Sequence, residues 1–315
     1  MQPVKTGIIG AGHFGRNYAR ILASLPEAEV VGIMDADADK AAALAGSFAV
    51  PAVTSMDELM DLAEAVAIVV PAAYHAAVCR QALERGLHVM MEKPFVLEPD
   101  EAGELTLLAE SKGLRLQIGH VERFNPAVAS ALEIAAVNRP VFIQAQRLFS
   151  HNPRIADVGV VMDAMIHDLD LMLAFAGNAG YMLHAAGVSR ITPFEDLVQA
   201  TISFDGGPLC SVTASRLSSR VSRRLDITLE DGCLEVDCPG QKLFMHRGGS
   251  SESIPVREAE PLKEELLQFL RCVHSGDKPL VSGQEGGRAV TLACRILETL
   301  KLSETEGVKD NAENR

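Results

Sequence analysis

The side chains best suited to acid–base chemistry lie in two short segments, VMMEKPFV at positions 89–96 and GVVMDAMIHDLDLM at positions 159–172. Lys93 follows an apolar run typical of a buried strand, and Pro94 fixes the turn after it and can adopt the cis form. Asp163 and His167 are four residues apart, a spacing that puts them on one face of a helix. A lysine at the end of a strand and an acid–imidazole pair can together hold a hydroxyl and remove its proton.

Simpler interpretations remain open for these residues. A lone lysine often caps the next helix, Asp163 could cap its own helix, and His167 could be a hydrogen-bonded core histidine. A metal site would need Asp168 or Asp170 as a further ligand, and no third histidine lies nearby. We therefore expect no metal.

A glycine-rich loop follows the first apolar run. Gly10, Gly12 and Gly15 fit the GxGxxG pattern, which gives a tight turn, a close backbone approach to a pyrophosphate and close helix–strand packing. Asp35 comes 20 residues after Gly15, where an acid accepts hydrogen bonds from ribose hydroxyls and repels a 2′-phosphate. The pattern favours NAD over NADP. The alternative is a glycine turn in a domain without a cofactor, with Asp35 as a helix N-cap.

The first 120 residues alternate between short β-branched runs and alanine- and leucine-rich segments with helical spacing. This rhythm predicts a parallel sheet covered by helices. The expected strands are 4–10, 29–35, 65–70, 88–92 and 115–120, and the expected helices are 14–24, 38–48, 56–63, 74–86 and 99–112.

The rhythm changes after residue 120, where segments of period two and Asp-Gly turns predict antiparallel strands. We expect domains at 1–120 and 121–303, followed by a disordered polar tail at 304–315. In the second domain we expect helices at 126–137, 159–176, 261–275 and 283–303, strands at 141–148, 197–207, 209–217, 223–232, 233–238 and 242–247, and a loop at 149–158.

Composition excludes several classes of protein. The formal net charge of −13 disfavours a nucleic-acid-binding surface. The chain has no apolar run of about 18 residues, so we expect no membrane helix. Six cysteines without a CxxC pair, and a start unlike a signal peptide, predict free thiols in a cytoplasmic protein.

Taken together, GAGHFG (10–15), EKP (92–94) and the G-x3-D-x3-H pattern that starts at Gly159 resemble the Gfo/Idh/MocA sugar dehydrogenases. The resemblance covers nearly the whole chain, including residues 69–94 and GQEGGRAV (283–290). It implies an α/β fold with an N-terminal Rossmann dinucleotide-binding domain and a C-terminal α+β domain built on a large, mostly antiparallel sheet. It also implies a homodimer or homotetramer formed through that sheet.

The resemblance assigns roles to individual residues. Lys93 would hold the substrate hydroxyl, His167 would be the general acid/base, and Asp163 would orient the substrate or the imidazole. The residues implied at the NAD site are Gly10, Gly12, His13, Phe14, Gly15 and Asp35, with Pro71 and His75 on a loop beside the cofactor and Glu92 and Pro94 at the nicotinamide pocket.

The segment GHVERFNP (119–126) resembles the subgroup that acts on nucleotide-activated amino sugars, particularly UDP-N-acetylglucosamine 3-dehydrogenases. That likeness implies that Arg123 and Asn125 face the sugar. The cations available to its phosphates are Arg147, Arg154, Arg216, Arg220, Arg223 and Arg224, although arginines along strands also occur on solvated faces.

Two alternatives use the same fold. One is an NAD(P)-dependent dehydrogenase of a free sugar, polyol or diol, and the other is a non-catalytic dinucleotide-binding regulator. A regulator has no need of a complete proton-handling set, so Lys93, Asp163 and His167 favour an enzyme with a small-molecule substrate.

Overall fold

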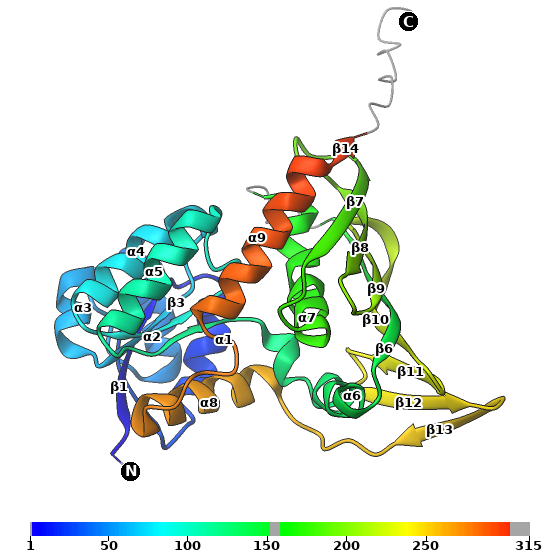
Figure 1. Ribbon diagram of the computed structural model, residues 1–315. Coiled ribbons are helices and arrows are strands. Elements are labelled where there is room, and N and C mark those ends of the chain that lie inside the picture. The colour runs from blue at the N-terminus through cyan, green and yellow to red at the C-terminus, as the bar shows by residue number, and fades with distance from the viewer. Residues whose placement is uncertain (1, 152–157, 303–315) are drawn as a thin grey trace, which may run out of the picture.

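The computed structural model describes residues 2–151 and 158–302 (Figure 1). The central part of the expected loop at 149–158, with Arg154, lies outside the described residues, and so does the expected tail at 304–315. The described chain forms two sheets with helices between and around them.

The first sheet is parallel, with strand order β2-β1-β3-β4-β5, which confirms the expected Rossmann arrangement. Its central strand, β3, is buried throughout, as a helix-covered parallel strand must be. The strands are β1 (Val4–Ile9), β2 (Ala28–Met34), β3 (Ala65–Ile68), β4 (His88–Met91) and β5 (Leu116–Ile118). The helices that connect and follow them are α1 (His13–Leu22), α2 (Ala38–Phe48), α3 (Met56–Leu62), a 3-10 turn η1 (Ala72–Tyr74), α4 (His75–Glu84) and α5 (Pro99–Ser111).

The order of these strands fixes where a ligand can bind. The chain leaves β1 for β2 on one side and returns to β3 on the other, so the connections diverge between β1 and β3. Open α/β sheets bind their ligands at such a point, beyond the carboxyl ends of the strands. The glycine loop, Asp35 and Lys93 all follow the carboxyl end of a strand.

The second sheet has nine strands in the order β13-β12-β11-β10-β6-β9-β8-β7-β14. It is mostly antiparallel, as expected, with parallel pairs at β6–β9 and β7–β14. The strands are β6 (Pro140–Ser150), β7 (Tyr181–Val188), β8 (Leu197–Phe204), β9 (Leu209–Ser215), β10 (Leu217–Leu229), β11 (Gly232–Asp237), β12 (Lys242–Arg247), β13 (Ser250–Ile254) and β14 (Lys301–Leu302).

Three of these strands were absent from the sequence expectations. β7 carries partly buried and exposed residues in alternation, and its Met182 and His184 face solvent, so its hydrophobic alternation is weak. β13 is a polar segment at the edge of the sheet, and β14 has only two residues. Edge strands need little hydrophobic patterning, because one partner supplies all their ladder hydrogen bonds.

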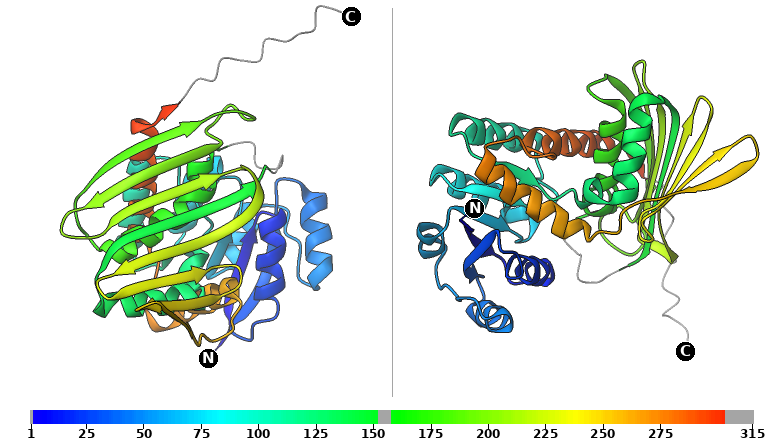
Figure 2. Two further views of the ribbon diagram at one scale, coloured as in Figure 1. Left: turned by 90° about the vertical axis from the view of Figure 1, so that its right-hand side faces the viewer. Right: turned by 90° about the horizontal axis from the view of Figure 1, so that it is seen from below.

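Helices lie between the two sheets and cover one face of the second sheet, while its other face carries no helix (Figures 1 and 2). These helices are a 3-10 turn η2 (Val121–Phe124), α6 (Pro126–Val137), a π-helical turn η3 (Val161–Met165), α7 (Ile166–Ala176) and α9 (Gly283–Thr299), while α8 (Pro261–Ser275) lies against the first half. α9 packs against α5 of the first half and against α7 and β7 of the second.

α8 returns to the first sheet. Its Leu266, Phe269 and Leu270 are buried in one apolar cluster with Ile8 and Tyr18. The late helices therefore tie the two sheets together. The domain boundary near residue 120 stays a prediction.

Within the described residues, no helix combines the length and the apolar character needed to cross a membrane. In the same part of the chain, no three His, Cys, Asp or Glu side chains are grouped so that they could hold a metal ion. All six cysteines are free thiols.

Candidate active site

The glycine loop joins β1 to α1, and two of its glycines are required by packing. Gly10 has a φ of 114°, and a Cβ there would lie 2.6 Å from the Val69 carbonyl oxygen. A Cβ on Gly15 would lie 2.1 Å from the Gly10 carbonyl oxygen. These contacts bring α1 close against the strands, as dinucleotide-binding loops require.

The third glycine faces open space. A Cβ on Gly12 would meet no atom within 4 Å, and Gly12 is the N-cap of α1, which has no side-chain capping bond. The first-turn N–H groups of α1 therefore have no side-chain acceptor, and the helix dipole favours an anion there. His13 and Phe14 are exposed beside the loop, with their rings in edge-to-face contact. This part of the chain fits the pyrophosphate of a dinucleotide.

Asp35 lies at the tip of β2 and contacts the glycine loop. Its Oδ2 accepts a hydrogen bond from the Ala11 N–H at 2.6 Å, and its Oδ1 accepts one from the Asp37 N–H at 2.9 Å. The N-cap of α2 is Asp37, whose side chain accepts from the Lys40 N–H. The alternative that Asp35 caps this helix is therefore wrong. Each Asp35 oxygen keeps a lone pair, and the carboxylate stands beside the loop.

Lys93 and Asp163 meet across the gap between the two sheets. The Lys93 Nζ lies 3.2 Å from the Asp163 Oδ1 and also donates to the Asp163 backbone carbonyl. Both side chains are mostly buried, with 11% and 13% of their surface exposed. The peptide bond between Lys93 and Pro94 is cis. The ammonium ion thus has a fixed position at the carboxyl edge of the first sheet.

The helix that carries Asp163 differs from the expected one. We expected regular α-helix over 159–176, but the segment Val161–Met165 is a π-helical turn that leads into α7. Such π-helical turns are rare, and those that occur often lie at functional sites. A change of helix type at Asp163 means that α-helical spacing alone does not place it relative to His167.

His167 lies on the first turn of α7. Its Nδ1 is buried without a hydrogen-bond partner, and its ring makes an edge-to-face contact with His120, with 5.9 Å between centroids. Burial, followed by the charge of Lys93 and of Arg147, holds the pKa of His167 well below its usual value of 6.5. The imidazole is therefore neutral at neutral pH and can accept a proton.

His75 and Glu92 are held inside the protein. The two ring nitrogens of His75 lie 2.7 Å from the Pro94 carbonyl oxygen and 2.9 Å from the Val70 carbonyl oxygen. Glu92 accepts hydrogen bonds from the Tyr18 hydroxyl and from the Lys93 N–H. His75 thus links the loop that precedes exposed Pro71 to the turn that carries Lys93. Both side chains support the loops instead of forming their surface.

Two residues expected to bind substrate have their polar groups occupied by the protein, which corrects the sequence prediction. Asn125 is 2% exposed. Its Oδ1 accepts from the Ala127 N–H as the cap of α6, and its Nδ2 donates to the Cys238 carbonyl. The Asn125-Pro126 pair is itself a helix-start signature, which the sequence already contained.

Arg147 is likewise buried, at 5% exposure. Its guanidinium makes a two-pronged ion pair with Asp168 and also contacts Glu122. Arg147 therefore anchors the first turn of α7 to β6 and η2. Arg123, the third expected substrate residue, has a side chain that is 12% exposed and lies 3.4 Å from Asp170.

Two further arginines, Arg223 and Arg224, lie on opposite faces of the second sheet. Arg224 is on the outer face and pairs with Asp226 and Glu235. Arg223 lies opposite Arg147 in the β10–β6 register, so it shares the inner face. Its charge acts on His167, and its guanidinium has no hydrogen bond or ion pair among the described residues.

A loop before β8 holds the start of the segment that carries Asp163 and His167. The Glu195 carbonyl accepts from the Val160 N–H at 2.9 Å, and its Oε1 accepts from the Val161 N–H at 3.1 Å. Gly159 is needed beside it, because a Cβ there would lie 2.0 Å from the Glu195 carboxylate. The glycine of the G-x3-D-x3-H pattern therefore leaves room for a cap.

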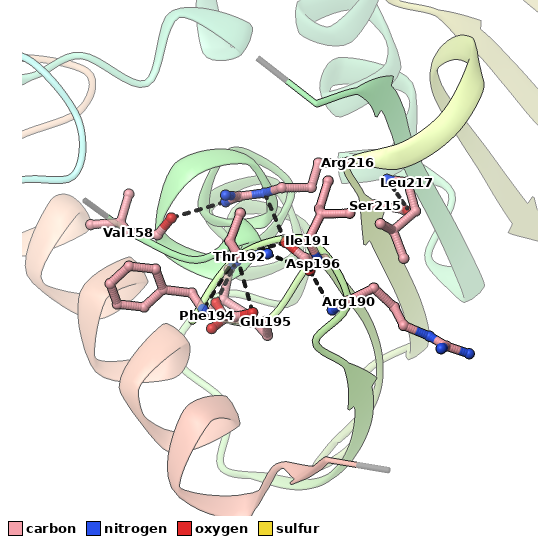
Figure 3. A network of polar contacts seen from close by, with 11 residues as sticks. Val158, Arg190, Ile191, Thr192, Phe194, Glu195, Asp196, Ser215, Arg216 and Leu217 are labelled. Carbon is pink, nitrogen blue, oxygen red and sulfur yellow. Dashed lines mark hydrogen bonds and ion pairs between the residues drawn. The ribbon is translucent and has the colours of Figure 1, made fainter. Parts of the chain in front are cut away.

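Figure 3 shows how this loop is fixed in turn. Asp196 accepts from the N–H groups of Arg190 and Ile191 and from the Thr192 hydroxyl. Arg216, 2% exposed, lies beside Asp196 and donates to the Val158 carbonyl. Arg216 is therefore a structural residue and not a phosphate ligand.

Two family models match the sequence. An oxidoreductase family model described as an NAD-binding Rossmann fold matches residues 4–120, and a Gfo/Idh/MocA C-terminal domain model matches residues 136–235. The chain belongs to the Gfo/Idh/MocA family of oxidoreductases. The family confirms an enzyme with a nicotinamide-dinucleotide domain.

Several relatives are named dehydrogenases. The chain is 32% identical to the UDP-N-acetylglucosamine 3-dehydrogenase of Acidithiobacillus ferrooxidans over 93% of its own length and 96% of the relative's. The solved structure of that enzyme superposes with a TM-score of 0.90, covering 95% and 98% of the two chains. The chain is 26% identical to a scyllo-inositol 2-dehydrogenase (NAD(+)) of Bacillus subtilis over 89% of each. A 3-ketoreductase of Actinomadura kijaniata, solved with NADP and TDP-benzene, is 19% identical with a TM-score of 0.86 and shares the fold.

The contact between Gly159 and Glu195 gives a prediction about stability. Gly159→Ala should push the Glu195 carboxylate off the Val161 N–H and lower the free energy of unfolding by about 1–3 kcal/mol, as for a buried donor left unpaired. Gly46→Ala on α2 is the matched control, because a Cβ there meets nothing within 4 Å and alanine favours a helix.

Urea unfolding of both variants, alone and combined with Glu195→Ala, measures the effect. The cost of Gly159→Ala should nearly vanish when Glu195 is already truncated, since the pair would then have no clash. An equal cost in both backgrounds would contradict the assigned contact.

Proposed function

We propose that this chain is an NAD-dependent dehydrogenase that oxidises a sugar hydroxyl to a ketone, with the 3-hydroxyl of UDP-N-acetylglucosamine or a related nucleotide amino sugar as its target. The observation that carries the proposal is the contact of Lys93 with Asp163, close to a neutral His167. A cation that holds a hydroxyl and an imidazole that accepts its proton are the two groups that alcohol oxidation needs.

The cofactor-binding roles follow from the carboxyl edge of the first sheet. The backbone of Gly10, Gly12 and Gly15 would receive the pyrophosphate, with His13 and Phe14 flanking it, and Asp35 would accept from the ribose hydroxyls. The loops held by His75 and Glu92, with Pro71 and Pro94, would border the nicotinamide. Bound there, the nicotinamide supplies the hydride acceptor.

The proton steps fall to three side chains. Lys93 donates a hydrogen bond to the substrate hydroxyl and stabilises negative charge on its oxygen as the proton leaves. His167 accepts that proton at Nε2, since Nδ1 is buried on the other side of the ring. Asp163 fixes the Lys93 ammonium through its carboxylate and its carbonyl.

The pH dependence follows from the lowered pKa of His167. A base must be unprotonated to act, so oxidation should continue below pH 6.5 and decline only as the pH falls through the lowered value.

Two features support a nucleotide sugar. The relative from Acidithiobacillus ferrooxidans named for this reaction matches over nearly the full length of both chains. In addition, Arg223, whose guanidinium has no partner among the described residues, places a cation on the inner face of the sheet, where its charge reaches His167 and Asp168. Such a cation suits a pyrophosphate linked to the sugar.

A second candidate is a dehydrogenase of a free sugar, polyol or diol, which the likeness to scyllo-inositol 2-dehydrogenase favours. It would use the same Lys93, Asp163 and His167. Because the chain is an oxidoreductase with this proton-handling set, a non-catalytic regulator is disfavoured.

We also propose a homodimer or homotetramer formed through the second sheet, in the cytoplasm. The face of that sheet without helices (Figure 2) carries a patch of uncharged polar side chains, and free thiols suit a reducing compartment. The patch consists of Gln144, Gln146, Gln199, Thr201, Ser211 and Thr213.

The substrate can be tested by mass spectrometry. We expect purified protein with NAD to remove two hydrogens from UDP-N-acetylglucosamine, with an amino donor and an aminotransferase added to withdraw the ketone. Lys93→Ala and His167→Ala should each lose turnover by about 10²-fold or more, while NAD binding measured by calorimetry is retained.

Activity on free sugars or polyols with none on nucleotide sugars would replace the first candidate by the second. Unchanged turnover in both variants would contradict the assigned chemistry.

Cofactor choice depends on Asp35. Asp35→Ala removes the acceptor for the ribose hydroxyls and the repulsion of a 2′-phosphate, so the preference for NAD over NADP should fall by about tenfold or more, equal to about 1.4 kcal/mol. Steady-state kinetics with each cofactor gives the ratio. A ratio equal to that of the unaltered protein would show that Asp35 only ties the glycine loop.

Arg223 and Arg224 are adjacent but lie on opposite faces of β10, which makes a matched pair of variants. Arg223→Gln should raise KM for UDP-N-acetylglucosamine by about tenfold with little change in kcat, because one charge-assisted hydrogen bond is lost. Arg224→Gln should leave KM unchanged. Equal effects of the two variants on KM would argue against phosphate binding by Arg223.

A further inference from the structure

Several buried polar atoms without partners gather behind His167. Within residues 2–151 and 158–302, both ring nitrogens of His120, the Nδ1 of His167 and the Oδ2 of Asp170 have no hydrogen-bond partner. His120 is 0% exposed and Asp170 is 2% exposed. Buried polar groups are almost always hydrogen-bonded, so a row of unpaired atoms needs a physical reason.

His120 stands between His167 and Asp170 in the interactions of this row. His120 packs edge-on against His167, with an angle of 87° between ring planes, and the charge of Asp170 acts on His120. Arg123 contacts the other oxygen of Asp170, so this carboxylate keeps one oxygen available. His167 is only partly buried, whereas His120 and Asp170 are both buried.

We propose that His120 is a positioning residue that takes the substrate proton from His167 and passes it to Asp170. The proposal rests on the dehydrogenase function proposed above. The hydroxyl O–H bond breaks and a proton joins the Nε2 of His167. The Nδ1 proton of His167 moves to one nitrogen of His120, and the proton on the other nitrogen of His120 moves to the Oδ2 of Asp170. Because these atoms are not hydrogen-bonded to one another, each transfer passes through an intervening water. One proton is displaced at each step, and no electrons leave these groups.

The surrounding charges favour this direction. Lys93, Arg147 and Arg223 are cations near His167 and, together with burial and His120, oppose a lasting imidazolium there. Asp170 faces Arg123, His120 and Glu285, and burial raises the pKa of its carboxyl group. Burial therefore disfavours the proton on His167 and favours a proton on Asp170, which is the direction of the relay.

The relay can be tested with His120→Phe, which keeps a ring and removes both nitrogens. We expect kcat to fall by about tenfold or more, with KM and the Kd for NAD unchanged, and the effect of D2O on kcat to increase because proton transfer becomes limiting. Asp170→Asn should give the same defect, and the double variant should lose no more than either single one. His88→Gln, at the amino end of β4, is the control for losing a histidine elsewhere.

A second measurement does not depend on turnover. In an NMR titration of the ring Cε1 signals, Asp170→Asn should lower the pKa of His120, because the charge of Asp170 raises it in the unaltered protein. An unchanged titration of His120 would overturn the proposal, even if no sugar were oxidised.

The kinetic arm separates the two ideas. If the unaltered protein oxidises a hydroxyl and His120→Phe matches it in kcat and in D2O effect, the relay is wrong and the enzyme function stands. Additive losses in the double variant, or a fall in thermal stability with raised KM and no D2O effect, would assign His120 a structural role instead. Failure of the unaltered protein on nucleotide sugars, free sugars and polyols would instead reject the proposed function.

Discussion

The contact between Lys93 and Asp163 is the interaction on which the site depends, because its two partners come from the two halves of the protein. Lys93 follows a strand of the parallel sheet, and Asp163 lies on the π-helical turn before α7, beside the antiparallel sheet. A separation of a few ångströms between the halves would leave two mostly buried charges unpaired, which is costly. Much of the remaining structure can be understood as holding these two segments at hydrogen-bond distance.

Three supports act on the segment that carries Asp163 and His167. Glu195 caps its first N–H groups, with Gly159 leaving the space. Arg147 ties Asp168 to β6, and α9 packs against both halves. Arg147 and Arg216, which were candidate substrate ligands in the sequence, instead make ion pairs and hydrogen bonds within the protein that hold this segment in place. Buried arginines pair with carboxylates in the protein because an unpaired charge there would be too costly.

The same burial sets the chemistry of the histidines. Desolvation and nearby cations keep His167 neutral, whereas desolvation makes Asp170 a better proton acceptor. Burial therefore lowers the pKa of the His167 imidazole and raises the pKa of the Asp170 carboxyl group. The two groups are thereby suited to different proton-transfer roles. A Cβ on Gly12 would meet open space, and the guanidinium of Arg223 has no hydrogen bond or ion pair in the part of the chain that the structure describes.

The sequence by itself determined the parallel sheet, the glycine loop, the order of helices and the family, because these depend on local periodicity, turns and short motifs. The pairing of Lys93 with Asp163, the π-helical turn, the cap from Glu195 and the row behind His167 were decided by tertiary structure. Each joins residues from 34 to 70 positions apart or depends on what surrounds a buried group, as Asp163 and Lys93 show. Asn125 is the intermediate case: its cap was readable from Asn-Pro, but its burial against Cys238 required the fold.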